Sequence, residues 1–343
     1  MTRETLFMKA INEGLDQAME RDERVVLLGE DISGGVNVEH LENNNKDAWG
    51  GVMGITRGLM PKYGRERVID TPISEHGYLS ASVGMALTGL RPVPELMFND
   101  FIGFCFDALL GQASKMRYMF GGKAKVPMVV RTMHGAGASA AAQHSGSYYG
   151  LFGSIPGIKV VVPATPYDAK GLLLASIEDD NVVIFSEDKT LYGLKGEVPE
   201  EYYTVPIGKA AVRREGEDLT IVTIGKMLYV AYEVADRLAK DNISVEVIDL
   251  RTVAPWDEET VLNSVKKTGR LIIVDEANPH NNTATDIASV VSDKAFDYLD
   301  GPVKCVCAPN TPVPFATNLE QAYIPDADKV LKVADELIQD LKG

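Results

Sequence analysis

The feature that most constrains the fold is a repeated alternation of short apolar runs with stretches of helical length. Strands buried on both faces of a parallel sheet are continuous apolar runs, and helices join one strand to the next. The sequence therefore predicts the α/β class, with mostly parallel sheets covered on both faces by helices. In the first part of the chain the apolar runs occupy residues 25–29, 67–70, 92–98, 126–133, 158–164 and 182–188. Helices are expected there at residues 5–20, 77–90, 100–118 and 166–180.

A second alternation of the same kind follows after residue 208. Its expected strands are residues 219–225, 244–250, 270–276 and 303–309, and its expected helices are 227–240, 257–268, 283–299 and 326–342. Residues 191–208 lack periodicity and carry two prolines, which is typical of a linker. A length of 343 residues also suggests two domains. We predict domains at residues 1–190 and 209–343, joined by the linker 191–208.

Charge and composition exclude some classes of partner. The net charge of −15, without a stripe of Lys and Arg, argues against nucleic acid. No apolar run reaches the ~20 residues of a membrane span, and the N-terminal segment lacks the apolar core of a signal peptide. Three cysteines, an odd and sparse number, fit a reducing compartment. We expect a cytoplasmic protein with no membrane or nucleic-acid partner.

Three unusual loops follow strands of the first domain. Gly29-Glu30-Asp31 ends the first strand, residues 71–77 follow the second, and the long loop 134–150 follows the run at 126–133. In open parallel sheets, ligands bind beyond the carboxyl ends of the strands. These loops are therefore expected to share one crevice.

The residues alone leave the chemistry of these loops open. Gly135-Ala136-Gly137 resembles a dinucleotide-binding turn, but the helix and the acidic residue about 20 positions later that complete such a fingerprint do not follow. No histidine or cysteine spacing indicates a metal site, and no Gly-x-Ser-x-Gly elbow is present. His144 fits a solvated loop as well as a functional one. Glu75 could simply cap the helix that follows it, because carboxylates favour helix N-termini.

Several segments together carry a family resemblance: "LLGED", "RVIDTPISE", "RPVPELMFNDF", "RYMFGGKAKVP", "AAQHS" and "SIPGIKVVVPATPYDAKGLL". In order and spacing, over almost the whole chain, they resemble the beta subunits of the thiamine-diphosphate-dependent 2-oxo acid dehydrogenase family. Within it, "DAWGGVMGITRGL" is most similar to the acetoin dehydrogenase branch. The resemblance implies a pyrimidine-binding transketolase-like domain followed by a transketolase C-terminal-like domain, both of the three-layer αβα type.

The resemblance also implies an activity and partners. With an alpha subunit, in a heterotetramer of two alpha and two beta chains, the protein would cleave acetoin to acetaldehyde. It would pass the acetyl unit to a lipoyl group on an acyltransferase core. The alternatives are a pyruvate or branched-chain 2-oxo acid dehydrogenase beta subunit, and a non-catalytic assembly subunit. A self-sufficient transketolase-like synthase is disfavoured, because the Gly-Asp-Gly motif of the magnesium site occurs nowhere in the sequence. Magnesium and the diphosphate would then be held by the alpha subunit.

Site residues are implied by position in the matching segments. Glu75 corresponds to the glutamate that shares a proton with the pyrimidine ring of thiamine diphosphate, which prepares the cofactor to become a nucleophile. Phe101 corresponds to the aromatic residue stacked on that ring, and Ile73 and Met97 to its apolar wall. His144 would assist proton transfer or receive the lipoyl group. Glu30 corresponds to an acidic residue between the two active sites of the tetramer.

The resemblance further implies a potassium ion held mostly by backbone carbonyls. The matching positions are Met128, Ser176, Ile177, Asp179 and Asn181. Two residues depart from the family pattern. His76 follows Glu75 where a small or apolar residue is expected, and Gly146 stands where glutamine is common. These departures bear on the surroundings of Glu75 and on the mouth of the site.

Overall fold

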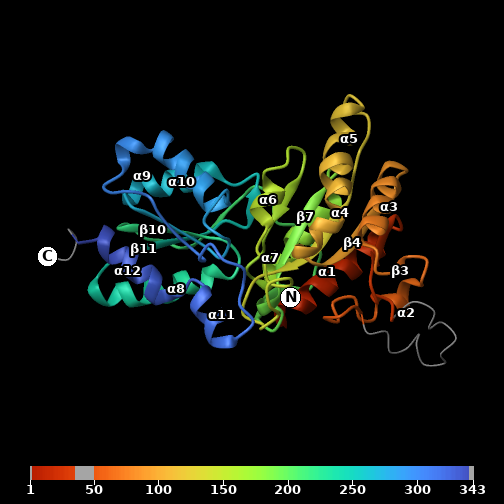
Figure 1. Ribbon diagram of the computed structural model, residues 1–343, viewed down its shortest axis with the longest axis horizontal. Coiled ribbons are helices and arrows are strands. Elements are labelled where there is room, and N and C mark those ends of the chain that lie inside the picture. The colour runs from red at the N-terminus through yellow and green to blue at the C-terminus, as the bar shows by residue number, and fades with distance from the viewer. Residues whose placement is uncertain (1, 35–49, 340–343) are drawn as a thin grey trace. The chain divides into compact units, whose positions relative to one another are not determined.

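The computed structural model describes residues 2–34 and 50–339. The chain divides into two compact units (Figure 1). Unit 1 holds residues 1–134 and 155–207, and unit 2 holds residues 135–154 and 208–343. Each unit has a mostly parallel sheet with helices on both faces, which confirms the expected α/β class. Residues 135–154 lie inside the expected first domain in sequence, but they make their contacts within unit 2.

The sheet of unit 1 places two of the three expected loops, those after β2 and β3, at one edge together with the segment after β4. Within the unit its strand order is β6-β7-β5-β4-β2-β3, and all of these strands are parallel. Leu27 of β2 pairs with Val68 of β3 on one side and with Val93 of β4 on the other, so the carboxyl ends of these three strands lie side by side. The strands are β2 (Val25–Gly29), β3 (Val68–Asp70), β4 (Arg91–Phe98), β5 (Val129–His134), β6 (Lys159–Val161) and β7 (Val183–Asp188).

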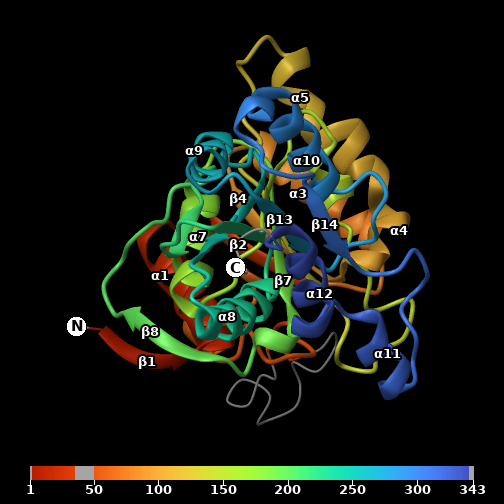
Figure 2. The same ribbon diagram turned by 90° about the vertical axis from the view of Figure 1, so that its left-hand side faces the viewer.

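Helices cover both faces of this sheet (Figure 2). On one face, α1 (Phe7–Arg21) packs against α7 (Pro166–Glu178), and on the other face α3 (Glu75–Leu87) packs against α4 (Ile102–Asp107). The buried side of α1 repeats at helical spacing, as the sequence predicts. The other helical elements of the unit are α2 (Leu59–Tyr63), η1 (Asn99–Phe101), η2 (Ala108–Ala113), α5 (Ser114–Met119) and η3 (Lys189–Leu191).

Two expectations for unit 1 need correction. The single helix expected at residues 100–118 is a series of short pieces, in which η2 is a π-helix and Cys105 has non-helical angles. The segment contains two glycines, which are poor helix formers, so it resists one regular helix. The linker expected at 191–208 contains strand β8 (Lys195–Pro199), which pairs antiparallel with β1 (Thr2–Leu6). The first helix consequently begins at Phe7 rather than at residue 5.

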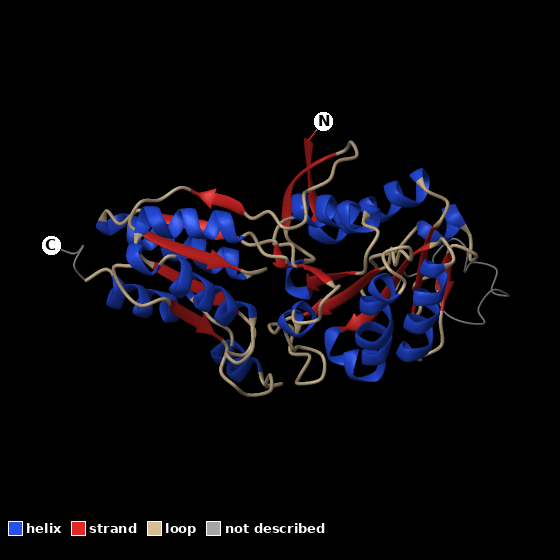
Figure 3. Cartoon of the chain, turned by 90° about the horizontal axis from the view of Figure 1, so that it is seen from above, coloured by secondary structure: helices blue, strands red, loops and turns tan. Residues whose placement is uncertain are grey.

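Unit 2 has a five-stranded sheet of order β14-β13-β10-β11-β9. The first four strands are parallel, whereas the edge strand β9 is antiparallel. Helices α9 (Glu258–Thr268) and α10 (Thr283–Lys294) cover one face, and α8 (Met227–Leu238) and α12 (Ala327–Leu337) cover the other (Figure 1); Figure 3 shows the strands between the helices. The five strands are β9 (Ala211–Arg214), β10 (Leu219–Thr223), β11 (Val245–Asp249), β13 (Leu271–Asp275) and β14 (Lys304–Cys307). The short strand β12 (Thr252–Ala254) is not part of this sheet.

The helical elements of unit 2 follow the expected order. They are α6 (Tyr149–Gly153), α8 (Met227–Leu238), η4 (Ala239–Asp241), α9 (Glu258–Thr268), α10 (Thr283–Lys294), η5 (Phe296–Tyr298), α11 (Thr317–Tyr323) and α12 (Ala327–Leu337). The edge strand β9 and the short helix α11 were not expected, since neither has a long periodic pattern. Across the described part of the chain, no helix is long and apolar enough to cross a membrane.

Candidate functional site

The candidate site of unit 1 lies at the carboxyl ends of β2, β3 and β4. Glu30 directly follows β2, Glu75 begins α3 five residues after β3 ends, and Phe101 follows β4 within η1. Because these strands are parallel neighbours, their loops emerge at the same edge. Glu30, Glu75 and Phe101 therefore lie on neighbouring segments of this unit, and the crevice expected from the sequence stays a prediction.

Glu30 lies in poorly solvated surroundings at this edge. Glu30 is only 8% exposed. Burial, together with the negative charges of Glu75, Asp31 and Glu95, raises the pKa of its carboxyl to about 7. A carboxylic acid with such a pKa is partly protonated at neutral pH, so this edge can hold a proton.

Glu75 is the first residue of α3 and is half-buried. The N-cap position is taken by Ser74, whose side chain makes no capping hydrogen bond. Glu75 is therefore not the N-cap residue, although the helix dipole still favours a carboxylate in the first turn. Its electrostatic effect on Glu30 places the two carboxyls near one another.

Apolar side chains surround this acidic edge. Phe101 is half-buried, and its ring lies 5.6 Å from that of Phe98 in an edge-to-face arrangement and 6.3 Å from that of Phe104. Met97, in β4, is half-buried, whereas Ile73 is 83% exposed. The neighbouring segments at this edge thus carry a carboxylate, an aromatic ring and apolar side chains.

A buried ionic network that the sequence reasoning missed lies behind this edge. Arg131 of β5 forms two hydrogen bonds with Glu187 of β7, at 2.7 and 2.9 Å, and one of 2.8 Å with Glu95 of β4. All three residues are buried. Each is a charged residue inside a largely buried strand, and Glu95 pairs with Arg131 in the sheet register. Facing charges in neighbouring strands were the signal that could have revealed them.

His144 lies in unit 2, on the loop between residues 135 and 148. The residue is half-buried, and its backbone N–H donates to the carbonyl oxygen of Ala141 at 3.3 Å. Its expected role, in proton transfer or in receiving the lipoyl group, remains a prediction.

The five positions expected to hold potassium lie in unit 1, four of them at and after the C-terminus of α7. Arg91 donates hydrogen bonds to the carbonyl oxygens of Ile177 at 2.8 Å and of Asp179 at 3.1 Å. The carbonyls of Met128 and Ser176 each accept one backbone hydrogen bond. A carbonyl oxygen has two lone pairs, so these groups keep the capacity to coordinate a cation. Over residues 2–34 and 50–339, no cluster of three or more His, Cys, Asp or Glu side chains could hold a metal.

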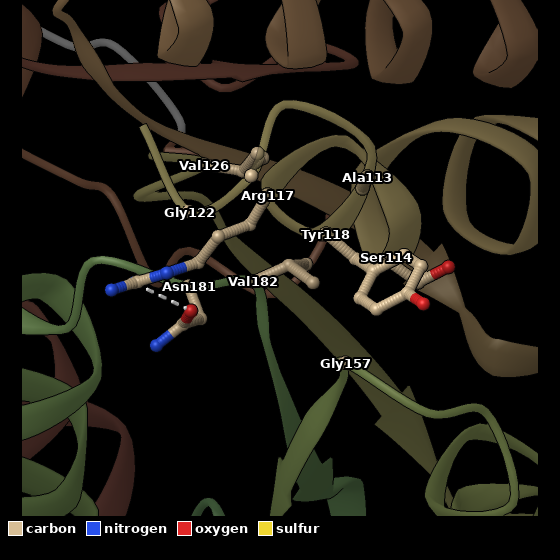
Figure 4. A pocket seen from close by; sticks show the side chains of 10 residues that line it. Ala113, Ser114, Arg117, Tyr118, Gly122, Val126, Gly157, Asn181 and Val182 are labelled. Atoms are coloured by element: carbon tan, nitrogen blue, oxygen red, sulfur yellow. Dashed lines mark hydrogen bonds between the residues drawn. The ribbon is translucent and has the colours of Figure 1, made fainter. Parts of the chain in front are cut away.

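A cavity of about 520 Å³ lies close to these positions in unit 1 (Figure 4). On one side of it, Arg117 of α5 donates a hydrogen bond to the side chain of Asn181 at 2.8 Å. Much of the rest of its wall is formed by Gly, Ala and Val residues. The described lining offers shape but no group suited to acid–base chemistry.

Comparison with known proteins gives the family. The profile described as "Transketolase, pyrimidine binding domain" matches residues 4–195, and "Transketolase, C-terminal domain" matches residues 208–330. The chain is 56% identical to the acetoin:2,6-dichlorophenolindophenol oxidoreductase subunit beta of Bacillus subtilis (strain 168), over 98% of both chains. The chain belongs to the beta-subunit family of the thiamine-diphosphate-dependent 2-oxo acid dehydrogenases.

Other members of this family are similar along the whole chain. The protein of the same name from Cupriavidus necator is 53% identical over 97% of each chain. The pyruvate dehydrogenase E1 component subunit beta of Bacillus subtilis (strain 168) is 41% identical over 97% of this chain and 98% of that one. A solved structure titled "Split gene transketolase, inactive beta4 tetramer" superimposes with a TM-score of 0.74 at 20% identity. It covers 97% of this chain and 98% of its own, and it supports the transketolase-like fold.

Proposed function

We propose that the chain is the beta subunit of the thiamine-diphosphate-dependent component of an acetoin dehydrogenase complex. The observation that supports this most is the 56% identity, over nearly the full length, to a protein named for acetoin oxidation. The relative named for pyruvate is less similar, at 41%. With an alpha subunit, the protein would cleave acetoin, release acetaldehyde and transfer the acetyl unit to a lipoyl group.

Glu75 is proposed to hold a proton at a ring nitrogen of the aminopyrimidine. The raised pKa of Glu30 beside it supports an edge with little solvent, where a hydrogen bond from a carboxyl group is strong. Phe101 would stack on the ring, and Ile73 and Met97 would complete its apolar wall. Bound thiamine diphosphate would supply the carbon nucleophile. The chain's own part is to orient the ring and control its protonation.

His144 is proposed to move a proton close to the reacting carbon or to receive the lipoyl group. An imidazole changes its charge near neutral pH, which suits proton transfer. Glu30, which can hold a proton at neutral pH, is proposed to lie between the two active sites of the tetramer.

Magnesium and the diphosphate are proposed to be held by the alpha subunit. Potassium is proposed at the carbonyls of Met128, Ser176, Ile177 and Asp179 together with Asn181. Arg91 already donates to two of these carbonyls, so a bound ion would share them with its guanidinium group.

An alpha subunit would explain the exposed apolar residues of unit 1. Ile73 is 83% exposed, Phe104 is 68% exposed and Tyr118 is 90% exposed. Exposed apolar patches of this kind mark interaction surfaces. We propose that this surface binds the alpha subunit in a heterotetramer, and that the complex joins a lipoyl-bearing acyltransferase core. The three cysteines are free thiols, which supports the cytoplasm as its compartment.

The test is a substrate comparison with the assembled enzyme. The protein is co-purified with its alpha subunit, and reduction of 2,6-dichlorophenolindophenol is followed with acetoin, pyruvate and a branched-chain 2-oxo acid. We expect kcat/KM for acetoin to exceed that for the 2-oxo acids by at least about tenfold. Equal or reversed preference would contradict the acetoin assignment. Activity that does not depend on this subunit's Glu75 would favour the non-catalytic alternative.

A further inference from the structure

The loop that carries His144 has an unusual backbone. Gly135 and Gly137 have φ angles of 96° and 110°, and two residues with side chains, Ser139 and Ala141, have φ angles of 51° and 60°. The left-handed region is unfavourable for residues with a Cβ atom. Such a conformation persists only where surrounding contacts fix it. The contacts that fix this loop therefore determine where His144 lies.

One of these contacts is made by the carboxylate of Glu320, in α11. Its Oε1 accepts a hydrogen bond from the backbone N–H of Gly137 at 2.7 Å, and its Oε2 accepts one from the N–H of Ser139 at 2.9 Å. The residue is 2% exposed. The hydroxyl groups of Ser139 and Thr317 lie 3.2 Å apart, beside the same carboxylate. A single buried carboxylate thus binds both sides of the strained turn.

A second contact is made at the start of the loop. The backbone N–H of Ala136 donates to Oε1 of Glu276 at 2.5 Å. Lys226 bridges to the other oxygen of Glu276 at 2.5 Å and also donates to the carbonyl oxygen of Ala136 at 2.5 Å. Both polar groups of the Ala136 backbone are therefore bound. At the other end of the loop, the carbonyl oxygen of Gly146 accepts a hydrogen bond from the N–H of Gly135 at 3.2 Å.

The three side chains that bind the loop all follow neighbouring strands of the sheet in unit 2. Lys226 follows β10, Glu276 follows β13 and Glu320 follows β14, and these strands are neighbours in the order β14-β13-β10. The methyl group of Ala136 also packs in a buried cluster with Ala308, Val313 and Tyr323. The loop is thus held from the carboxyl edge of the second sheet.

We propose that Glu320 is a positioning residue that fixes the His144 loop for the reaction. Glu276 and Lys226 fix the same loop at a second point. The proposal rests on the proposed function of His144. Glu320 does not act on the substrate; it sets the backbone from which the imidazole projects. Its carboxylate suits this task because it accepts two N–H groups at once, whereas the amide oxygen of glutamine would serve only one of the two positions.

The test is a double-mutant cycle in the complex with the alpha subunit. The variants are Glu320→Gln, His144→Ala and the double variant, with Glu336→Gln as the matched control. Glu336 lies on α12, and its half-exposed carboxylate pairs with Lys304 of β14 at 3.0 Å. We expect Glu320→Gln to lower kcat about 10- to 100-fold, because misplacement of a reacting group is costly. The KM for acetoin should change less than about twofold, and Glu336→Gln should leave both constants unchanged.

The cycle separates positioning from general damage. In the His144→Ala background, Glu320→Gln should lower kcat by less than about twofold, because its effect passes through the imidazole. Amide hydrogen exchange at Gly137 and Ser139 should quicken in Glu320→Gln, while exchange in the strands of unit 2 stays unchanged. A full additive effect, or unchanged kcat in Glu320→Gln, would overturn the proposal while leaving the role of His144 intact. Unchanged activity in His144→Ala would instead overturn the proposed function of that residue, and the inference with it.

A second variant covers the case in which Glu320→Gln does not assemble. Gly137→Ala places a Cβ at a φ of 110° on an exposed turn, which displaces the N–H group that Glu320 binds. We expect the same fall in kcat and the same loss of effect in the His144→Ala background. A Gly137→Ala enzyme with the activity of the original protein would overturn the positioning role.

Discussion

Two carboxyl groups at the same sheet edge, those of Glu30 and Glu75, differ in their surroundings. Glu30 is 8% exposed and has a raised pKa, whereas Glu75 lies half-buried in the first turn of α3. The position of Glu75 could be predicted from the sequence, because a short strand, a turn and a helix follow each other within a few residues. The burial of Glu30 could not, because Glu95, 65 positions later in the sequence, contributes to its environment.

Replacing Glu75 tests its proposed proton. Glu75→Gln keeps the size of the side chain and removes the acidic group, so the assembled enzyme should form while turnover falls by about 10²–10⁴-fold. The measurement is dye reduction with acetoin, alongside size-exclusion chromatography of the complex. As a control, Glu66→Gln changes a carboxylate in the turn before β3. Activity of Glu75→Gln within twofold of the original would contradict the proton role.

The pKa of Glu30 gives a prediction for stability against pH. The folded chain keeps this proton up to about pH 7, whereas an unfolded glutamate loses it near its ordinary pKa of about 4.5. The folded state therefore binds more protons between these values, and Glu30 lowers the stability as the pH rises through that window. Glu30→Gln should raise the melting temperature by about 3–6 °C at pH 8 and by much less at pH 5.

Thermal unfolding of the full chain at several pH values measures this difference. The control is Glu259→Gln, because 78% of the Glu259 side chain is exposed. The stability of this variant should show no such dependence on pH. A stabilisation by Glu30→Gln that is equal at pH 5 and pH 8 would show that the cause is packing rather than the buried charge.

Among elements, those with a strong period were predicted well and those made by distant pairing were not. Strand β2 has the expected bounds, because its apolar run is continuous and buried on both faces. The segment expected as one helix at 100–118 is helical but irregular, because it contains a π-helical segment and non-helical backbone angles at Cys105. Strand β8 was missed, since its partner β1 lies almost 200 residues earlier in the sequence and its own pattern is polar. The role of Glu320 was missed for the same reason, because its contact with Gly137 spans 183 positions.

The packing of α1, α7 and the end of β8 depends on one buried cation. The side chain of Lys170 is fully buried, and its Nζ donates to Glu13 at 2.7 Å. It also donates to the carbonyl oxygens of Pro199 at 2.7 Å and Glu201 at 3.0 Å. Lys170→Met would leave these acceptors without their donor, and we expect a loss of about 3 kcal/mol in the free energy of unfolding.

Urea unfolding of the full chain measures the effect of Lys170→Met. The matched control is Lys195→Met, because Lys195 is 66% exposed and pairs with Glu4 at 3.3 Å on the surface. An exposed pair contributes about 0–1 kcal/mol, so this control should be nearly neutral. Equal stability losses in the two variants would contradict the structural role of the buried lysine.

At the scale of the whole molecule, the sequence predicted two α/β units but not where the His144 loop makes its contacts. In the sequence, the loop follows a strand of the first sheet, so the expected division assigned it to the first domain, residues 1–190. Its contacts lie instead with Lys226, Glu276 and Glu320 in unit 2. Such contacts between distant parts of a chain leave no local periodicity, so composition and pattern could not reveal them. One consequence is that changes in the second unit are expected to alter the chemistry assigned to His144.

Without its alpha subunit, the chain is expected to bind thiamine diphosphate only weakly. The edge of unit 1 is proposed to bind the pyrimidine ring, and the alpha subunit is proposed to hold magnesium and the diphosphate. Charged hydrogen bonds to a diphosphate contribute about 1.5–3 kcal/mol each, so under this division the isolated chain should bind thiamine diphosphate at least about 100-fold more weakly than the complex with the alpha subunit. Isothermal titration calorimetry with and without magnesium measures both affinities. Tight, magnesium-dependent binding by the isolated chain would contradict the shared site.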